Sequence, residues 1–228
     1  VAVRLAEHAK DIPAAARERL LGRLRYCRVE LGAQDVAGAV RALLDRSSPA
    51  SAPDSLRPVA TYLALPPRLF GPAVTELGEA GLPHGSRIVI EKPFGESLEG
   101  ARNLNRLLRC VAGDAGERAV FRVDHVLGMA TVHNLLGVRL ANRIIEPLWN
   151  SIHIAQVEIL WEETLALEGR AGYYDHAGAL KDVMQNHMLQ ILSLVAMEPP
   201  SPLRDPDLRD RRVEALRTVC TPARDEIA

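Results

Sequence analysis

Three short apolar runs, separated by segments with helical spacing, constrain the fold of this chain more than any other feature. The runs occupy residues 59–65, 87–92 and 120–124. Prolines or glycines bound the first two runs, which favours buried strands over helices. Residues 68–80 have helical spacing, and Ser97 is a suitable N-cap for a second helix with leucines on one face. Strand, helix and strand in this order predict a parallel α/β sheet.

Two charged residues stand where the second and third predicted strands end. Lys92 closes the run 87–92, and Asp124 closes the run 120–124. Ligands of parallel α/β sheets bind beyond the carboxyl ends of the strands. The pattern therefore indicates a site near Lys92 and Asp124.

The segment before this sheet has a different composition. Residues 13–46 show helical spacing, which an alternating stretch at 25–32 interrupts, and this alternation suggests a short strand. Residues 47–58 are rich in serine, proline, alanine and aspartate, which is typical of a loop.

Beyond residue 128 the pattern changes again. After a helix to about residue 140, residues 154–163 alternate polar and apolar side chains, as a half-exposed antiparallel strand does. Residues 178–197 form a long predicted helix, which prolines then end. The positions that we expect it to bury are Leu180, Val183, Met184, Ile191, Leu194 and Val195. From residue 201 onward the chain is charged, and we expect a solvated helix or an irregular end.

Charge and cysteine content narrow the class of protein. The 228 residues carry a formal net charge of −1, so nothing favours nucleic acid or an anionic membrane as a partner. Cys27, Cys110 and Cys220 are far apart, which favours reduced thiols in a cytoplasmic protein over a disulfide or zinc site. No run is long enough to span a membrane, and the first residues lack the apolar core of a signal peptide.

His187 is the first candidate catalytic residue. It lies among apolar positions of the predicted helix 178–197, where a structural histidine with a hydrogen-bond partner is the more frequent case. A catalytic acid or base needs a second group that fixes the imidazole tautomer and stabilises its charge. Asp124 is a candidate for that group, although spacing alone does not show that the two residues meet.

Lys92, Glu163 and Asp182 are further candidates. Lys92 precedes Pro93, which holds its backbone extended and defines its position. Glu163 and Asp182 have the acceptor oxygens that bind the hydroxyls of a polyol. Taken one at a time, each of the three is more often a surface charge than a ligand.

Four histidines of the second half do not form a metal-binding motif. They are His125, His133, His153 and His176. Their spacing matches no recognised set of zinc ligands, so we expect no metal site.

Taken together, the motifs change this assessment. In chain order they are YLALPP at 62–67, RIVIEKPFG at 87–95, RVDH at 122–125, RLANR at 139–143, WN at 149–150, GYYD at 172–175, GALKDVMQNH at 178–187 and AMEPP at 196–200. Many long motifs in one order are far more specific than any one of them. In these motifs and their spacing, the chain resembles the glucose-6-phosphate dehydrogenase family over more than half of its length.

The resemblance implies an oxidoreductase of the oxidative pentose phosphate pathway, which oxidises glucose 6-phosphate to 6-phosphogluconolactone with hydride transfer to NADP. It assigns the proton-accepting histidine to His187 and the aspartate that supports it to Asp124. It places Lys92 near the reacting hydroxyl and the nicotinamide, and it places Glu163 and Asp182 against the sugar hydroxyls. Oxidising a hemiacetal to a lactone leaves a proton to be removed, and a carboxylate-backed imidazole does this near neutral pH.

The resemblance also assigns Pro93 to placement of the coenzyme and His125 to the substrate phosphate. It implies a cytoplasmic homo-oligomer that binds a sugar phosphate. NADP is the expected coenzyme, with NAD as the alternative. The choice between NADP and NAD stays open. The residues that select one coenzyme over the other normally follow a glycine-rich turn, and this sequence does not contain that turn.

By this resemblance the chain combines two incomplete parts. Residues 1–125 correspond to a Rossmann-like dinucleotide-binding domain, a parallel α/β sheet without its glycine-rich turn. Residues 126–228 correspond to the start of an α+β substrate domain with an antiparallel sheet. We expect most of that second sheet and the subunit interface to lie beyond residue 228. We also expect an unpaired edge of the parallel sheet to lower solubility.

Two positions depart from the family pattern. The family usually has DHYLGKE where this chain has DHVLGMA at 124–130. Val126 and Met129 therefore replace a tyrosine and a lysine that contact the sugar phosphate. A hydrogen bond to a charged group contributes about 1.5–3 kcal/mol. Loss of the lysine alone should thus weaken phosphate binding roughly tenfold to a hundredfold.

Three functional hypotheses remain at this point. The first is a glucose-6-phosphate dehydrogenase whose activity depends on segments outside this chain. The second is a truncated, catalytically silent homologue that is a gene remnant or binds a partner. The third is a sugar dehydrogenase with altered phosphate specificity, which the changes at Val126 and Met129 would suit.

Overall fold

A three-stranded parallel sheet forms the centre of the structure, a computed structural model that describes residues 1–31, 35–47, 58–95, 97–162, 171–201, 204–220 and 223. Its strands are β1 (Ala60–Leu63), β2 (Arg87–Glu91) and β3 (Val120–Val123), in the order β1-β2-β3. Both neighbouring pairs are parallel, with Val89 of β2 opposite Tyr62 of β1 and Phe121 of β3. The predicted parallel α/β sheet is therefore confirmed.

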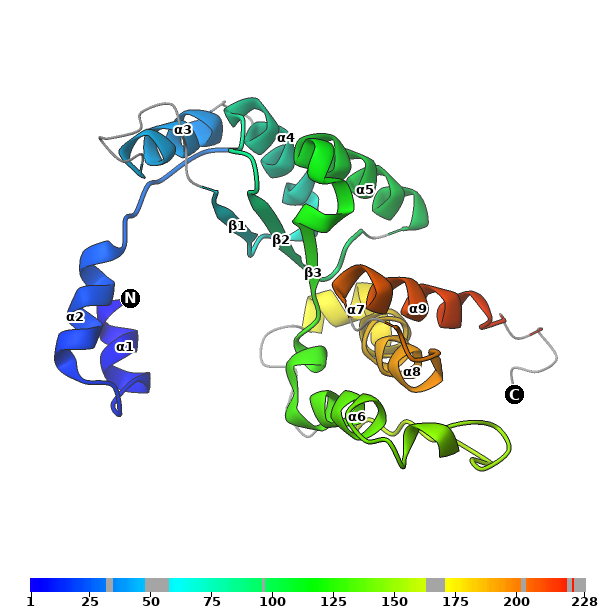
Figure 1. The fold of residues 1–228 in the computed structure, drawn as a ribbon. Helices are drawn as coiled ribbons and strands as arrows, with labels where there is room; N and C mark the ends of the chain where they lie inside the picture. Colours follow the sequence, from blue (N-terminus) through cyan, green and yellow to red (C-terminus); the bar gives the residue numbers. More distant parts are fainter. Residues whose placement is uncertain are drawn as a thin grey trace.

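Helices α4 (Phe70–Ala80) and α5 (Leu98–Ala112) cover one face of this sheet (Figure 1). The short 3₁₀ helices η1 (Pro67–Leu69) and η2 (Gly113–Ala119) join them to the strands. Buried side chains from both helices and all three strands form the first core cluster. They are Leu63, Phe70, Ala73, Val74, Leu77, Ile88, Ile90, Leu104, Leu108 and Val120.

The turn from β2 into α5 has defined local causes. Ser97 caps the helix as predicted, because its hydroxyl accepts a hydrogen bond from the Gly100 amide at 3.1 Å. Gly95 has a φ of +138°, and a Cβ at this position would lie 2.7 Å from the Ala101 nitrogen. The turn therefore requires glycine at residue 95.

Helix α3 (Asp35–Ser47) packs beside α4, with polar contacts at the start of α3 and at the end of α4. The Val36 amide donates to the buried Glu76 carboxylate at 3.0 Å, and Arg41 Nε donates to the Ala80 carbonyl at 3.2 Å. Both contacts place opposite charge at a helix terminus, which is favourable.

Helices α1 (Ala2–His8) and α2 (Ala14–Arg23) lie to one side of the sheet and bury no residue (Figure 1). The strand predicted at 25–32 is wrong for the described residues 25–31, which have no regular structure. No described strand lies beside this segment to supply hydrogen bonds, and an isolated strand is not stable. The predicted loop at 47–58 falls largely outside the described residues.

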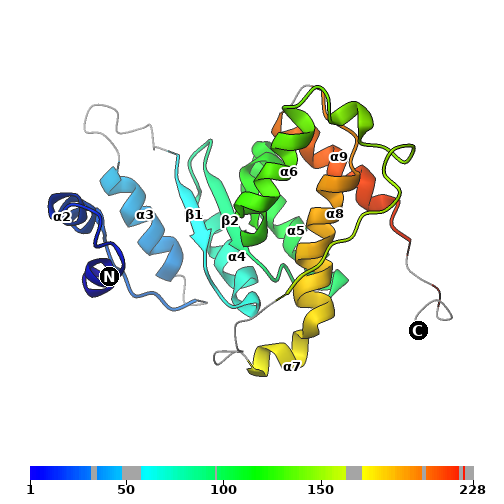
Figure 2. The ribbon, with the colours of Figure 1, turned by 90° about the horizontal axis from the view of Figure 1, so that it is seen from below.

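A second group of helices follows the sheet. They are η3 (His125–Gly128), α6 (Ala130–Leu140), η4 (Glu146–Leu148), α7 (Ala171–Ala179), the π-helix η5 (Leu180–Met188), α8 (Leu189–Ala196) and α9 (Asp205–Arg217). Figure 2 shows α6, α8 and α9 grouped on one side of the sheet. Val126, Val132, Leu194 and Met197 form their shared core.

Three expectations for this half need correction. Residues 154–162 contain no strand, because no described segment pairs with them; the predicted antiparallel sheet is thus not seen. Leu180 and Met184 of the long helix are 67% and 51% exposed instead of buried. Helix α9 is not solvated on all sides, because it packs against α8 through Leu208 and Ala215.

The part of the chain that the structure describes has no helix with both the length and the apolar character needed to cross a membrane.

The core gives a direct test of this packing. Leu108 is fully buried in the first core cluster, whereas Leu98 of the same helix is 67% exposed. Leu108→Ala should lower the free energy of unfolding by about 2–5 kcal/mol, because it leaves a cavity. Leu98→Ala should change it by no more than about 0.5 kcal/mol. Urea denaturation of both variants measures this difference, and equal losses would contradict the assigned core.

Candidate active site

The carboxyl ends of two neighbouring strands meet one buried residue of a helix at the candidate site. Lys92 follows the last residue of β2, and Asp124 follows the last residue of β3. Since β2 and β3 are parallel neighbours, both residues lie at the same edge of the sheet. His187 comes to this edge from the π-helix η5. π-Helical stretches are rare and occur often at functional sites.

Asp124 and His187 form a buried pair. His187 Nδ1 lies 2.7 Å from Asp124 Oδ1, and their side chains are only 3% and 8% exposed. His187 Nδ1 and Asp124 Oδ1 are at ion-pair distance but lack the alignment of a hydrogen bond, and Asp124 Oδ2 has no hydrogen-bond partner among the described residues. Hydrogen bonds of catalytic pairs are often poorly aligned without substrate, so the short distance supports a direct pairing of the two side chains.

Lys92 connects the other imidazole nitrogen to Asp182. Its ammonium lies 2.8 Å from His187 Nε2, 2.8 Å from Asp182 Oδ1 and 3.2 Å from the Asp182 carbonyl oxygen. A lysine ammonium has three donors and no acceptor, so these contacts use all of its hydrogens.

These contacts assign the tautomer of His187. The Lys92 ammonium donates to Nε2, so Nε2 must carry a lone pair instead of a proton. The proton of the neutral ring is then on Nδ1, facing the Asp124 carboxylate. In this state, Nε2 is the basic atom, and the carboxylate stabilises the positive charge that forms when Nε2 takes up a proton.

Two aromatic side chains fix the plane of the imidazole. Trp161 stacks on His187 with ring centroids 5.5 Å apart and an interplanar angle of 17°. The exposed His125 meets the same ring edge-on at 4.8 Å. The segment 154–162 therefore contributes Trp161 to the site although it forms no strand. Trp161 is not among the site residues predicted from the sequence, and only its place two residues before Glu163 could have suggested it.

The other predicted site residues have different positions. Pro93 is half-buried beside Lys92, and the peptide bond between them is cis. Glu163 lies outside the described residues. Val126 is fully buried in the second core cluster, whereas Met129 is 46% exposed. Neither Val126 nor Met129 can donate a side-chain hydrogen bond to a phosphate.

Arg212 of α9 is a further charged residue near Asp124, which the expectation of a solvated C-terminal segment missed. Burial lowers the pKa of its guanidinium, the Asp124 carboxylate opposes this change, and Arg209 adds to it. The side chain of Arg212 is partly buried and donates to Ser193 Oγ at 3.0 Å.

Asp124, His125 and His187 each offer one ligand atom within 4.8 Å of the others. This spacing would also suit a metal ion, but the Lys92 ammonium contacts the same imidazole. Positive charges of Lys92 and Arg212 disfavour a dication there, so the arrangement suits proton transfer better. The expectation that the chain holds no metal stays a prediction.

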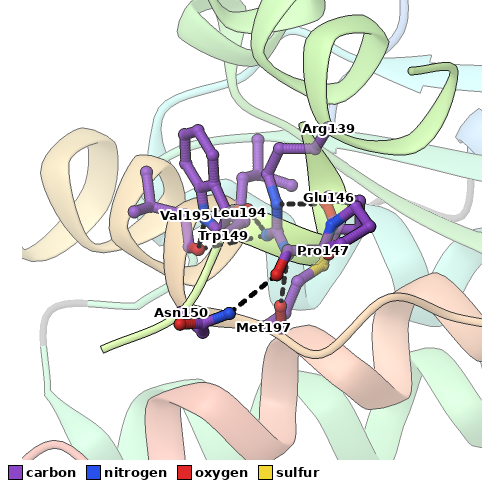
Figure 3. Close-up of polar contacts among 8 residues, drawn as sticks. All are labelled: Arg139, Glu146, Pro147, Trp149, Asn150, Leu194, Val195 and Met197. Atoms are coloured by element: carbon purple, nitrogen blue, oxygen red, sulfur yellow. Dashed lines mark hydrogen bonds and ion pairs between the residues drawn. The ribbon is translucent and has the colours of Figure 1, made fainter. Parts of the chain in front are cut away.

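Arg139 anchors the end of the helix that carries His187 (Figure 3). Its guanidinium is 1% exposed and donates to both Glu146 oxygens at 3.1 and 2.7 Å. It also donates to the last carbonyls of this helix region, those of Leu194, Val195 and Met197, at 2.6, 3.1 and 2.9 Å. All its N–H groups are thereby used, and the ends of α6 and α8 are joined.

Trp149 strengthens this anchor. Its indole nitrogen donates to the Val195 carbonyl at 2.8 Å, and the Arg139 guanidinium lies 5.2 Å from its ring centroid. Trp149 and Arg139 thus contact each other through a cation–π interaction and share the Val195 carbonyl as acceptor, so both hold the same end of α8.

Two family models match the chain. The glucose-6-phosphate dehydrogenase NAD binding domain matches residues 2–134, and the glucose-6-phosphate dehydrogenase C-terminal domain matches residues 136–228. The chain belongs to the glucose-6-phosphate dehydrogenase family. The predicted resemblance is thus confirmed, and the fold agrees with a Rossmann-like NAD-binding part.

Individual members of the glucose-6-phosphate dehydrogenase family agree with this assignment. The chain is 46% identical to glucose-6-phosphate 1-dehydrogenase of Caenorhabditis elegans over 69% of its length, and 39% identical to that of Rhizobium meliloti over 94%. It matches the crystal structure of glucose-6-phosphate 1-dehydrogenase from Mycobacterium avium with a TM-score of 0.75 and 36% identity over 95% of the chain. A glucose-6-phosphate dehydrogenase in complex with its substrate glucose-6-phosphate matches with a TM-score of 0.78 and 32% identity over 92%.

The chain spans less than half of these relatives. It covers 30% and 42% of the two curated proteins and 47% and 43% of the two solved chains.

The Arg139 anchor predicts a large stability effect. Arg139→Ala should lower the free energy of unfolding by about 3–5 kcal/mol, because it leaves Glu146 as a partly buried, unpaired charge. Arg143→Ala, on the same segment but exposed, should cost at most about 0.5 kcal/mol. Chemical denaturation compares the two, and a small effect at Arg139 would show that the anchor does not hold the helices.

Proposed function

We propose that this protein oxidises glucose 6-phosphate at its anomeric carbon, as a part of a glucose-6-phosphate dehydrogenase. The observation that carries the proposal is the buried arrangement in which Asp124 and Lys92 contact opposite nitrogens of His187. An imidazole suits removal of a hydroxyl proton when a carboxylate pairs with one nitrogen and the other nitrogen can accept a hydrogen bond from a donor.

In this mechanism, His187 Nε2 accepts the proton of the anomeric hydroxyl. The Lys92 ammonium, 2.8 Å from Nε2, marks a position that a donor group can occupy beside the base. Proton uptake makes the ring an imidazolium, which the Asp124 carboxylate stabilises and keeps in orientation. Trp161 and His125 pack on the ring and limit its rotation.

Asp182 and Lys92 supply the polar contacts for the sugar hydroxyls in this proposal. Their side chains are 17% and 20% exposed and already paired, so substrate hydroxyls would exchange with existing hydrogen bonds. His125, exposed at the mouth of the site, is the proposed phosphate contact. Glu163 keeps its predicted role as a hydroxyl acceptor.

The residues of this chain fit one end of a nicotinamide dinucleotide. When bound, the coenzyme accepts the hydride, so it must lie close to His187. Lys92 and Pro93, at the carboxyl end of the central strand β2, lie there. No comparable site for the phosphates of the coenzyme follows the described strands, since no glycine-rich turn follows β1, β2 or β3. We propose NADP as the coenzyme, with NAD as the alternative.

A specific observation supports a second candidate. Val126 is buried in an apolar core and Met129 presents an apolar side chain to solvent, so neither of these two positions supplies a cation to a phosphate. A sugar dehydrogenase with weaker selection for phosphorylated sugars would be consistent with this corner. The division at residue 125, the homo-oligomer and the cytoplasmic location stay predictions.

The proposed base predicts the first kinetic result. The purified chain, mixed with glucose 6-phosphate and NADP, should produce reduced coenzyme that is followed by absorbance. His187→Asn should lower kcat by about 10²–10⁴-fold, because the proton acceptor is lost. His133→Asn changes an exposed histidine of α6 and serves as the matched control. An unchanged rate in His187→Asn would refute the base, and no turnover by the folded chain with phosphorylated or free sugar would favour a silent homologue.

The phosphate corner predicts the second kinetic result. Met129→Lys should lower KM for glucose 6-phosphate roughly tenfold to a hundredfold, because it adds a charged donor near the phosphate. KM for unphosphorylated glucose should not change. If both KM values stay the same, the assignment of this corner to phosphate is incorrect.

A further inference from the structure

Helix α9 contacts β3, which ends just before Asp124, and α8, which continues the helix of His187. On one side, Arg209 Nη1 donates to the carbonyls of Glu117 and Val120, at 3.2 and 3.5 Å. The same guanidinium lies 5.3 Å from the ring centroid of Phe121. Arg209 thus holds α9 against β3, the strand that ends at Asp124.

Arg212, one turn further along α9, contacts the helix that carries His187. Its Nε donates to Ser193 Oγ at 3.0 Å, and its Nη2 donates to Gln190 Oε1. Ser193 is fully buried, and Gln190 stands three residues after His187, on the adjacent turn. Two arginines three residues apart on one helix face therefore connect β3 to α8, which continues directly from η5.

We propose that Arg212 is a positioning residue, which holds the helix of His187 against Asp124 and keeps a positive charge beside the Asp124 carboxylate. This role rests on the proposed function, in which Asp124 must remain charged to stabilise the imidazolium. Arg212 itself does not touch the reacting atoms.

The electrostatics of the site agree with this role. Burial lowers the pKa of the Arg212 guanidinium, and the Asp124 carboxylate opposes this change, so the two opposite charges attract each other. Among the described residues, the other charged and titratable groups around Arg212 and Asp124 are Lys92, His125, Asp182, His187 and Arg209. An arginine stays protonated over the whole working range of pH, so its electrostatic effect on the Asp124 carboxylate is constant.

The neighbouring Arg211 provides a control that distinguishes the positioning role of Arg212 from a general effect of arginine on the stability of α9. Its Nη1 pairs with Glu214 of the same helix at 2.8 Å, and both side chains are largely exposed. Arg211→Gln removes the same charge and shape from the same helix without touching α8 or Asp124.

The test compares Arg212→Gln, Arg212→Lys and Arg211→Gln in the full chain. Arg212→Gln should lower kcat about tenfold to a hundredfold while KM changes less than about threefold, since the substrate contacts stay in place. Arg212→Lys, which keeps the charge, should recover most of the rate. Arg211→Gln should match the unmodified protein. Circular dichroism of each variant checks that it folds.

A second readout does not depend on turnover. The Nδ1 proton between His187 and Asp124 should give a low-field NMR signal, which Asp124→Asn removes and identifies. This signal should be lost or shifted in Arg212→Gln and retained in Arg212→Lys and Arg211→Gln. If the chain shows no turnover but the signal behaves in this way, the proposed function fails while the positioning role stands.

Two results would overturn the role of Arg212. The first is that Arg212→Gln and Arg211→Gln have the same low-field NMR signal and the same kcat. The other is equal impairment of Arg212→Gln and Arg212→Lys, because that pattern would assign to the arginine a role in packing alone.

Discussion

The buried contact between Asp124 and His187 is the interaction on which the rest of this structure depends. It joins the end of a strand to the last turn of a π-helical segment, 63 positions later in the chain, with both side chains almost fully enclosed. Burying an acid beside a base is costly unless the neighbouring charges compensate. Lys92 contacts His187 from the other side, and Arg212 adds a positive charge near the carboxylate. The charges around the site are thus balanced, and the basic nitrogen of His187 is Nε2, which accepts a hydrogen bond from Lys92.

The packing around the site explains how this contact is held. The parallel pairing of β2 and β3 brings Lys92 and Asp124 to one edge of the sheet, and the helices α4 and α5 support these strands from one face. His187 reaches this edge because the helix that carries it is fixed at its far end by Arg139, whose guanidinium takes up the carbonyls there. Helix α9 then connects that helix to β3. This part of the chain therefore contains both members of the proposed proton-transfer pair, together with the proposed phosphate corner at Val126 and Met129.

The sequence predicts those parts of the structure that depend on local pattern. Short apolar runs between helices predict the three parallel strands, and the rule for parallel sheets places Lys92 and Asp124 at one edge. Other features depend on partners that are distant in sequence. Residues 154–162 have the alternation of a strand, but they contain none because no described strand pairs with them. The charged composition of α9 suggested solvent exposure, yet the contacts of Arg209 and Arg212 exist only in the folded chain. The place of Trp161 in the site could not be predicted from the residue itself. An aromatic residue in a segment that alternates polar and apolar side chains is equally consistent with a core position.

Asp124 and Lys92 together hold His187 in the tautomer that carries its proton on Nδ1. Nitrogen-15 NMR of the labelled histidine rings, with His187 assigned through His187→Asn, measures this directly at a pH where the ring is neutral. We expect a protonated Nδ1 and an unprotonated Nε2, and we expect Asp124→Asn to reduce this preference. A His187 ring with its proton on Nε2 would contradict the assigned tautomer, because Nε2 would then be unable to accept the proton of a substrate hydroxyl.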